Sequence, residues 1–464
     1  MYNQKKFKMN KFRFTALMLI FTFALTAKAQ EPTTEEKITE LKETVNGLLE
    51  RLATDETDLQ KLTKIKVSGY MQAQYQYFDN PAIQPNNYFM LRRARVKFTY
   101  EMVDGVKFVL TPEFVPGNLS VKDAYVVLND RWTKAFSVWA GKFNRPNYEV
   151  EYSSSSRELP ERSTLIRTLY PNERAIGAKL EFNPLNVPIH FQLAVLNGAD
   201  LMTINNASGT NLNTTENKDF DNFKDIMVRS TYNLQLGNFG GLDFGAHGYF
   251  GSLKSNALKT LSSDYTTIKD IKVGDAVKRN WVGAEFQLFA DVLGGMSLKG
   301  EYIAGKNASI GYSPVAAAGT TAAIPGVANF QNNFSGYYVY FIKNLGVKNQ
   351  FAFRYDYYDP NTDITGKDVT ITKYSSPDAI TLKSRTSGKS DLATSTFGFA
   401  LLHYFDDNLR VSLNYEIVQN EKVGTVGALT EDYTKADGTK VVKGLDYSNV
   451  LKQNLLTLRI QAKF

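Results

Sequence analysis

The feature that most constrains the fold is a two-residue alternation of apolar and polar side chains, which recurs from Lys64 to the last residue. In the segment KIKVSGYMQAQYQYF, residues such as Ile65 and Val67 lie on one face and residues such as Lys66 and Gln72 on the other. Successive side chains of a β-strand point to opposite faces, so the pattern predicts an all-β fold. Beyond the N-terminal region, no apolar run reaches the ~18 residues of a transmembrane helix. A membrane-spanning form of this chain would therefore cross with strands.

Short and long connections take turns between the alternating segments. The short ones are residues 103–105, 183–188, 236–240, 291–295, 345–347 and 406–408. The long polar ones are residues 144–173, 198–222, 252–277, 307–332, 360–391 and 422–447. Short turns at one end and long loops at the other are typical of outer-membrane barrels, whereas a β-sandwich usually has shorter strands. The sequence predicts a transmembrane antiparallel β-barrel of about 16 strands over residues 64–464.

The N-terminal region predicts export from the cytoplasm. Basic residues between Lys5 and Arg13 precede the short apolar segment Phe14 to Ala27, and Ala27-Lys28-Ala29 forms a small-residue cleavage site. These are the parts of a signal peptide over residues 1–29, and the apolar part is too short for a membrane anchor. The segment holds six basic residues and no acidic one, so its removal lowers the formal net charge from +7 to +1. The basic pI therefore gives no support for nucleic-acid binding.

Residues 30–63 show a helical period. Leucine and other apolar residues recur at spacings of three and four, interrupted once at Asp55, at positions Ile38, Leu41, Val45, Leu48, Leu52, Leu59 and Leu62. Such a seam is typical of a coiled coil, and Thr33-Thr34-Glu35-Glu36 resembles a capping box. We expect a short periplasmic coiled coil that helps to form a trimer; an amphipathic helix on another surface is the alternative.

Several segments of the barrel region resemble the phosphate-selective porin O/P family. They are LRRARVKF (Leu91 to Phe98), KDAYVVL (Lys122 to Leu128), AGKFNRP (Ala140 to Pro146), SSSSRELPERS (Ser153 to Ser163) and PNERAIGAKLEF (Pro171 to Phe182). The resemblance implies a homotrimeric, anion-admitting channel of the Gram-negative outer membrane, surrounded by lipid and lipopolysaccharide. It also implies a third extracellular loop that folds inward, which here is residues 144–173. The aromatic Phe464 on the last strand is a signal typically read by the outer-membrane assembly machinery.

The alternation also assigns side chains to the barrel interior. If Val96 and Phe98 face lipid, then Arg93, Arg95 and Lys97 face the lumen. Over all segments, roughly thirteen basic and nine acidic residues face inward, which predicts a modest preference for anions. Arg92 conflicts with strict alternation unless the strand carries a bulge. Arg459 is expected near the periplasmic mouth. The candidate pore-lining and anion-binding residues are Arg92, Arg93, Arg95, Lys97, Arg157, Arg162, Arg167, Lys179, Arg229 and Arg354.

An enzyme is disfavoured by the sequence. The chain has three histidines and no cysteine, and it lacks the HExxH, GxSxG and P-loop motifs, so we expect no catalytic residues, metal ligands or cofactors. His190 and His247 fall on lumen faces, which keeps a barrel lipase or protease as one alternative and a purely structural outer-membrane protein as another. Passive diffusion of small hydrophilic solutes through a porin is the function that the sequence favours.

Overall fold

A computed structural model describes the chain as two units, Met1–Lys64 and Ile65–Phe464. Its described residues are 34–80, 85–147, 149–151, 154–198, 219, 221–313, 326–369, 389–424, 433–434, 440–441, 447, 450 and 453–464. The predicted signal peptide, residues 1–29, lies outside them. The first unit contains helix α2, Thr34–Thr63, over the stretch where the apolar residues follow a helical period. None of the described helices is long and apolar enough to cross a membrane.

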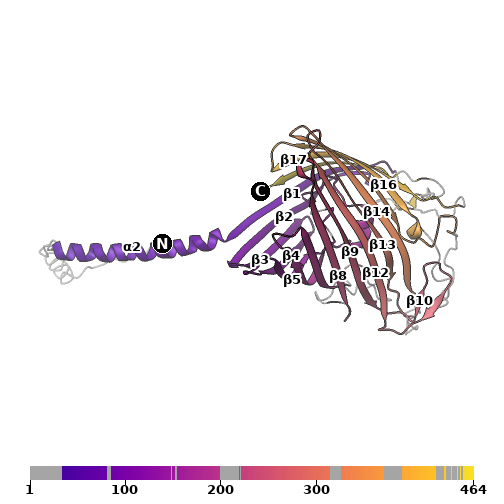
Figure 1. Ribbon diagram of the computed structural model, residues 1–464, viewed down its shortest axis with the longest axis horizontal. Coiled ribbons are helices and arrows are strands. Elements are labelled where there is room, and N and C mark those ends of the chain that lie inside the picture. The colour runs from indigo at the N-terminus through magenta and orange to yellow at the C-terminus, as the bar shows by residue number, and fades with distance from the viewer. Residues whose placement is uncertain are drawn as a thin grey trace, which may run out of the picture. The chain divides into compact units, whose positions relative to one another are not determined.

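Within its described residues, the second unit is a closed antiparallel barrel of sixteen long strands, as predicted (Figure 1). The strands are β1 (Ile65–Phe78), β2 (Asn87–Val103), β3 (Val106–Val115), β4 (Asn118–Asn129), β5 (Phe136–Asn144), β6 (Arg174–Phe182), β7 (Ile189–Asn197), β8 (Lys224–Gln235), β9 (Gly240–Lys254), β12 (Ala276–Ala290), β13 (Met296–Ser309), β14 (Asn329–Leu345), β15 (Asn349–Asp359), β16 (Thr394–Tyr404), β17 (Leu409–Asn420) and β20 (Leu455–Lys463). Each strand pairs with its neighbour along the chain, and β1 pairs with β20 to close the sheet.

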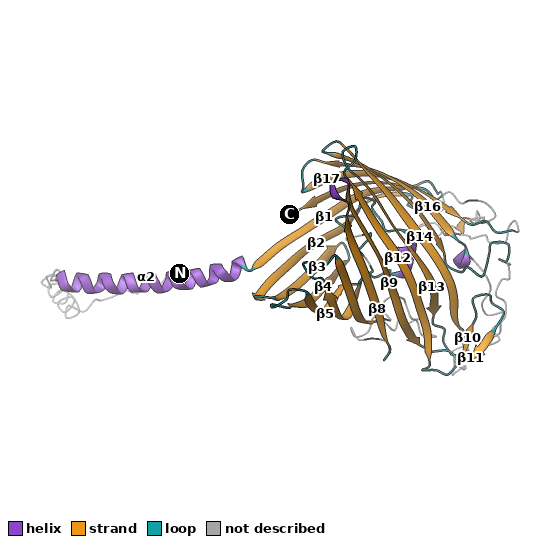
Figure 2. Cartoon of the chain, viewed as in Figure 1, coloured by secondary structure: helices purple, strands orange, loops and turns teal. Residues whose placement is uncertain are grey.

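The connections alternate in length as predicted, and antiparallel pairing puts the two kinds at opposite ends of the barrel (Figure 2). The link from β3 to β4 departs from this pattern, because it is short although it lies at the long-loop end. Residues 252–277, predicted as a loop, contain a small hairpin of β10 (Lys259–Leu261) and β11 (Ile268–Asp270). The other short elements are α3 (Thr164–Leu169), η2 (Gly237–Phe239), η4 (Lys389–Asp391), β18 (Tyr433–Thr434) and β19 (Lys440–Val441).

Burial along the strands is the reverse of that in a water-soluble protein. On β20, Leu458 and Ile460 are 42% and 47% exposed, whereas Arg459 and Gln461 are 3% and 1% exposed. On β15, Arg354 and other polar residues are likewise buried between outward-facing aromatic residues. The apolar side chains therefore form the outer surface of the barrel, and the polar side chains line its interior.

A β-bulge interrupts the alternation on β2. Gln72 of β1 lies opposite Arg93, but the next residue, Ala73, lies opposite Leu91, so Arg92 has no partner on β1. The extra residue changes the direction in which the following side chains point. Arg92 and Arg93 can therefore both point inward, which strict alternation forbids.

Closure of the barrel requires a glycine at position 69. The backbone of Gly69 exchanges two hydrogen bonds with Phe464, with N···O distances of 2.9 and 3.0 Å. A Cβ atom on Gly69 would lie 2.5 Å from the carbonyl oxygen of Arg95 and 2.5 Å from the Phe464 ring. The last residue and the neighbouring strand β2 thus approach the backbone of β1 more closely than any side chain would allow.

Replacement of Gly69 by alanine is expected to destabilise the barrel, because its methyl group would overlap the backbone of β2. Overpacking of this kind costs about 1–3 kcal/mol. Urea unfolding in lipid vesicles, followed by tryptophan fluorescence, measures the change. Gly47→Ala in α2 is the control, since no atom lies within 4 Å of the added carbon. Equal unfolding midpoints for Gly69→Ala and the unaltered protein would contradict this account of closure.

Candidate functional site

The segment of residues 145–173, which joins β5 to β6, is bound by side chains from strands that lie far apart around the barrel. Gln72 of β1 donates to the backbone oxygen of Ser154 at 2.8 Å. Lys299 of β13 donates to Glu158 at 2.9 Å. Arg410 of β17 donates to the backbone oxygen of Arg157 at 2.8 Å. Contacts with such distant parts of a closed sheet place this segment, named here the inner segment, within the barrel.

Glu161 of the inner segment accepts hydrogen bonds from three arginines of the barrel wall. Arg92 donates two parallel hydrogen bonds to its carboxylate, at 2.9 and 3.0 Å, in the bidentate geometry that arginine and carboxylate favour. Arg459 of β20 donates to the same carboxylate at 3.2 Å and to the backbone oxygen of Pro160 at 2.8 Å. Arg354 of β15 donates to the backbone oxygen of Glu161 at 2.8 Å. The bulge on β2 thus allows Arg92 to reach the inner segment.

The arginines around Glu161 keep it ionised. Burial alone would raise its pKa, but the hydrogen bond from Arg92 and the charges of Arg92, Arg93 and Arg459 hold the pKa of Glu161 well below its usual range. An ordinary glutamate has a pKa of about 4.3. Because the folded pKa is depressed, the stabilisation is fully present above that ordinary value and is lost only as the pH falls through the folded pKa. The contact therefore persists in neutral and mildly acidic solution.

Helix α3 fixes the second half of the inner segment. Ser163 caps the helix, its Oγ accepting a hydrogen bond from the backbone N–H of Ile166. Glu151 accepts hydrogen bonds from the backbone N–H and the hydroxyl of Ser163 at 2.7 and 3.0 Å, and from the hydroxyl of Tyr340 on β14 at 2.6 Å. Trp281 of β12 donates to the hydroxyl of Tyr170 at 2.6 Å. The helix is therefore anchored to one side of the wall.

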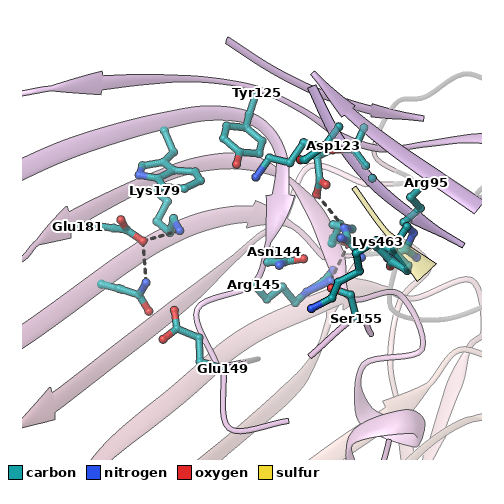
Figure 3. Close-up of a pocket in the computed structure, with 18 of the residues that line it drawn as sticks. Arg95, Asp123, Tyr125, Asn144, Arg145, Glu149, Ser155, Lys179, Glu181 and Lys463 are labelled. Carbon is teal, nitrogen blue, oxygen red and sulfur yellow. Dashed lines mark hydrogen bonds and ion pairs between the residues drawn. The ribbon is translucent and has the colours of Figure 1, made fainter. Parts of the chain in front are cut away.

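A cavity of about 670 Å³ lies between the inner segment and strands β1–β7 (Figure 3). Six cationic and three acidic side chains line it. The cationic residues are Arg95, Lys97, Arg145, Arg174, Lys179 and Lys463, and the acidic ones are Asp123, Glu149 and Glu181. Cationic side chains therefore outnumber acidic ones in the lining of this cavity.

Arg95, Arg174 and Lys179 already have acidic partners. Arg95 pairs with Glu113 at 2.5 Å, and Arg174 pairs with Asp123 at 2.8 Å. Lys97 and Lys463, in contrast, form no ion pair within the described part of the chain. They are the cavity lysines that can meet a mobile anion without first breaking an ion pair.

Lys179 is held by an aromatic surface as well as by an acid. Its Nζ lies 2.6 Å from Glu181 and 3.9 Å from the centre of the Trp139 ring. Tyr125 stacks against Trp139, with ring centres 4.7 Å apart. A cation over an aromatic face is stabilised by the negative charge density of the ring. The lysine is thus fixed against the wall instead of extending across the cavity.

Two groups of the predicted site residues come together. Arg92, Arg93 and Arg157 gather near Glu161, and Arg157 is 1% exposed. Arg95, Lys97 and Lys179 line the cavity.

The other four predicted residues belong to neither group of side chains, although Arg354 also donates to the backbone oxygen of Glu161. Arg162 donates to the backbone oxygen of Tyr170 at 2.6 Å, and Arg167 is exposed in the last turn of α3. Arg229 and Arg354 are buried, and each contacts a different group of wall carboxylates, at 2.5 Å from Glu285 and 2.8 Å from Glu416 respectively.

The expected position of Arg459 was wrong. It contacts the inner segment instead of lying near the periplasmic mouth, because it is opposite Gln74, which in turn is opposite Met90, close to Arg92. The alternation did not select the cavity residues Arg145 and Arg174. Arg145 lies outside any strand, and Arg174 is an odd number of residues from Lys179. Their signal in the sequence is limited to their position at the two ends of a highly charged loop.

Residues 65–436 match the profile of the family described as phosphate-selective porin O and P. Among solved structures, the barrel is similar to the anion-selective porin from Comamonas acidovorans, at 12% identity and a TM-score of 0.51, covering 86% of this chain and 99% of that one. It is also similar to Pseudomonas putida OprB at high pH, at 10% identity and a TM-score of 0.53, covering 88% and 96%. At these identities the likeness is one of fold.

No curated protein matches the sequence. The family profile, however, covers most of the chain and almost the whole barrel. Together with the closed barrel and its porin-like neighbours, this match shows that the chain belongs to the phosphate-selective porin O and P family, whose members are outer-membrane channels.

Proposed function

We propose that this protein lets small hydrophilic solutes diffuse across the Gram-negative outer membrane with a modest preference for anions, phosphate among them. The observation that carries the proposal is the charged cavity inside the closed barrel, where six cationic side chains oppose three acidic ones. An anion that enters loses part of its hydration, and lumen guanidinium and ammonium groups replace it. Passive diffusion through such a channel requires no catalytic residues.

The pairing of lumen charges suits a channel better than a tight binding site. Arg95, Arg174 and Lys179 are each shared with a wall carboxylate, which weakens their hold on a passing anion. Conduction requires sites that attract solutes yet release them quickly. Lys97 and Lys463 supply the attraction that remains.

We further propose that the inner segment is the third extracellular loop and narrows the pore. Exposed charges act over about 8 Å at physiological salt, so only those near the narrowest point bias permeation strongly. The anchoring of Glu161 by Arg92 and Arg459 supports a constriction that stays in place. In this arrangement the short turns face the periplasm, and the outer apolar surface contacts lipid and lipopolysaccharide.

Deletion of residues 150–170 is expected to enlarge the single-channel conductance and admit larger sugars, because the segment that occupies the lumen is removed. Planar-bilayer recording and liposome swelling measure the two effects. Heat-dependent gel mobility verifies that the shortened barrel is folded. An unchanged conductance would place the segment outside the permeation path, and no conductance from the intact folded protein would favour an enzymatic or structural role.

Reversing the charge of Lys97 is expected to shift selectivity toward cations. Lys97 lines the cavity without an ion partner in the described residues, so Lys97→Glu disturbs no existing pair. Coulomb's law with screening gives a change of roughly two- to five-fold in the anion-to-cation permeability ratio. Reversal potentials in a KCl gradient report it, and potassium phosphate tests for phosphate preference.

Lys348→Glu is the matched control, because Lys348 is exposed at the turn between β14 and β15 and does not line the cavity. The same charge change there is expected to have a much smaller effect. Equal shifts in reversal potential for the two variants would show that the average charge of the lumen sets selectivity, and not the region beside the inner segment.

We propose that α2 is a periplasmic coiled coil that joins three copies of the chain. The apolar positions of its seam are exposed within the first unit, for example Leu41 at 68% and Leu52 at 59%. Pairing with the same seam of other copies would bury them. Strand β1 starts at the short-turn end, since Ile65 lies opposite Tyr100, which supports a periplasmic location for the preceding residues.

Deletion of residues 34–62 is expected to lower the temperature at which the trimer dissociates while leaving each barrel folded, because the helix and the barrel are separate compact units. Unboiled gels at rising temperature and crosslinking measure the oligomer. The heat-dependent mobility of the released monomer shows whether the barrel is intact. A trimer of unaltered stability, or crosslinking that yields monomer alone from the full-length protein, would contradict the proposal.

A further inference from the structure

Three ionisable side chains meet on the barrel wall at a place apart from the cavity. His247 of β9 lies between Glu285 of β12 and Glu301 of β13, with its Nδ1 3.5 Å from a Glu285 oxygen and its Nε2 3.3 Å from Oε1 of Glu301. All three side chains are at most 3% exposed. One potential metal-binding atom from each residue lies within 4.8 Å of the other two. This group is named here the histidine–glutamate triad.

The strand register builds the triad. Glu285 lies directly opposite Glu301, and His247 lies opposite Gly283, two residues from Glu285 on the same face. A Cβ on Gly283 would lie 2.4 Å from Cε1 and Nε2 of the imidazole. The ring therefore occupies the space that the glycine leaves, and any side chain at this position would displace it from between the two carboxylates.

Outer partners orient both carboxylates. Tyr338 donates to Oε2 of Glu301 at 2.5 Å. Arg229 donates to Oε1 of Glu285 at 2.5 and 3.1 Å and to its Oε2 at 3.1 Å. Oε1 of Glu301 and both nitrogens of His247 make no hydrogen bond within the described residues, although all are buried. Hydrogen-bond partners that orient the ligands are usual around metal sites.

The charges of the triad also favour a cation. Two buried carboxylates face one arginine, and Arg229 is itself shared with Glu149 at 3.1 Å. A buried charge without a partner is costly, so a further positive charge between the carboxylates would be stabilising. A metal ion or a proton on the imidazole can supply it, and a proton on one of the two carboxylates would remove the need for it.

We propose that the histidine–glutamate triad binds a divalent transition-metal ion, with Zn²⁺ as the best-fitting probe. The 3.3 Å between Nε2 and Oε1 of Glu301 is close to the edge of a tetrahedron whose ligands lie about 2.0–2.1 Å from zinc. One imidazole with two carboxylates suits zinc and related ions, whereas Ca²⁺ and Mg²⁺ favour oxygen ligands alone. Arg229 contacts both Glu285 of the triad and Glu149, which lines the cavity.

Titration of the full-length, folded protein tests the site. The protein in detergent is stripped with a chelator, and ZnCl₂ is added while heat release and thermal unfolding are measured. One zinc per chain is expected, with a rise in unfolding temperature because the ion joins three strands. His247→Gln and Glu301→Gln are expected to weaken binding at least ten-fold, whereas Tyr338→Phe, which removes an outer partner, weakens it roughly ten-fold or more.

The other two histidines provide matched controls. His190→Gln and His403→Gln are expected to bind zinc as the unaltered protein does. Co²⁺ supplies a second readout, since its visible absorption reports nitrogen and oxygen ligands and should vanish in His247→Gln. Should a ligand variant fail to fold, Tyr338→Phe and the cobalt spectrum of the unaltered protein still decide the matter. Absence of stoichiometric binding, or binding retained in His247→Gln, would overturn the proposal and leave protonation of the imidazole or of a carboxylate as the way in which the buried charges are balanced.

Discussion

Backbone hydrogen bonding across the β1–β20 seam is the constraint on which the rest of the structure depends. A strand inside a bilayer has no water to satisfy its N–H and C=O groups, so a sheet that crosses a membrane must close upon itself. Nine residue pairs between Tyr70–Lys463 and Phe78–Leu455 make this closure. At one end of the seam, the absence of a side chain on Gly69 leaves space for Phe464, the final residue. With the sheet closed, the apolar faces of the strands meet lipid and the polar faces share one enclosed interior.

That interior contains many ionised groups, and many of those in the described residues are stabilised by a partner of opposite charge. Arg279 and Asp225, each with a side chain 1% exposed, lie 2.8 Å apart. Arg354 contacts Asp356 at 2.9 Å and Glu416 at 2.8 Å. Breaking one partner from such a pair is costly, so these pairs fix the wall side chains in place. Lys97 and Lys463 form no ion pair within the described residues and lie outside this network.

The inner segment depends on the same network. Its carboxylates and carbonyl oxygens accept hydrogen bonds from wall arginines, as with Glu161 and Arg92, and its apolar residues Leu165 and Ile166 are fully buried. Hydrogen bonds and apolar contacts to different sides of the barrel wall hold the inner segment in the interior. The histidine–glutamate triad lies on the barrel wall, and its imidazole and carboxylates come from the three neighbouring strands β9, β12 and β13.

The sequence by itself determined the barrel, its strand number, its alternating loops and the inward placement of Arg93, Arg95, Arg229 and Arg354, because a period of two along the chain translates directly into two faces of a sheet. Tertiary structure alone decided which inward residues meet. The bulge at Arg92 breaks the period, and the stagger of β20 against β1 brings Arg459 to Glu161. The histidine–glutamate triad could not be predicted from the sequence either, since His247, Glu285 and Glu301 form no motif in the chain. The pairing register of β9, β12 and β13 places them side by side, and register is a property of the paired strands and not of any one segment.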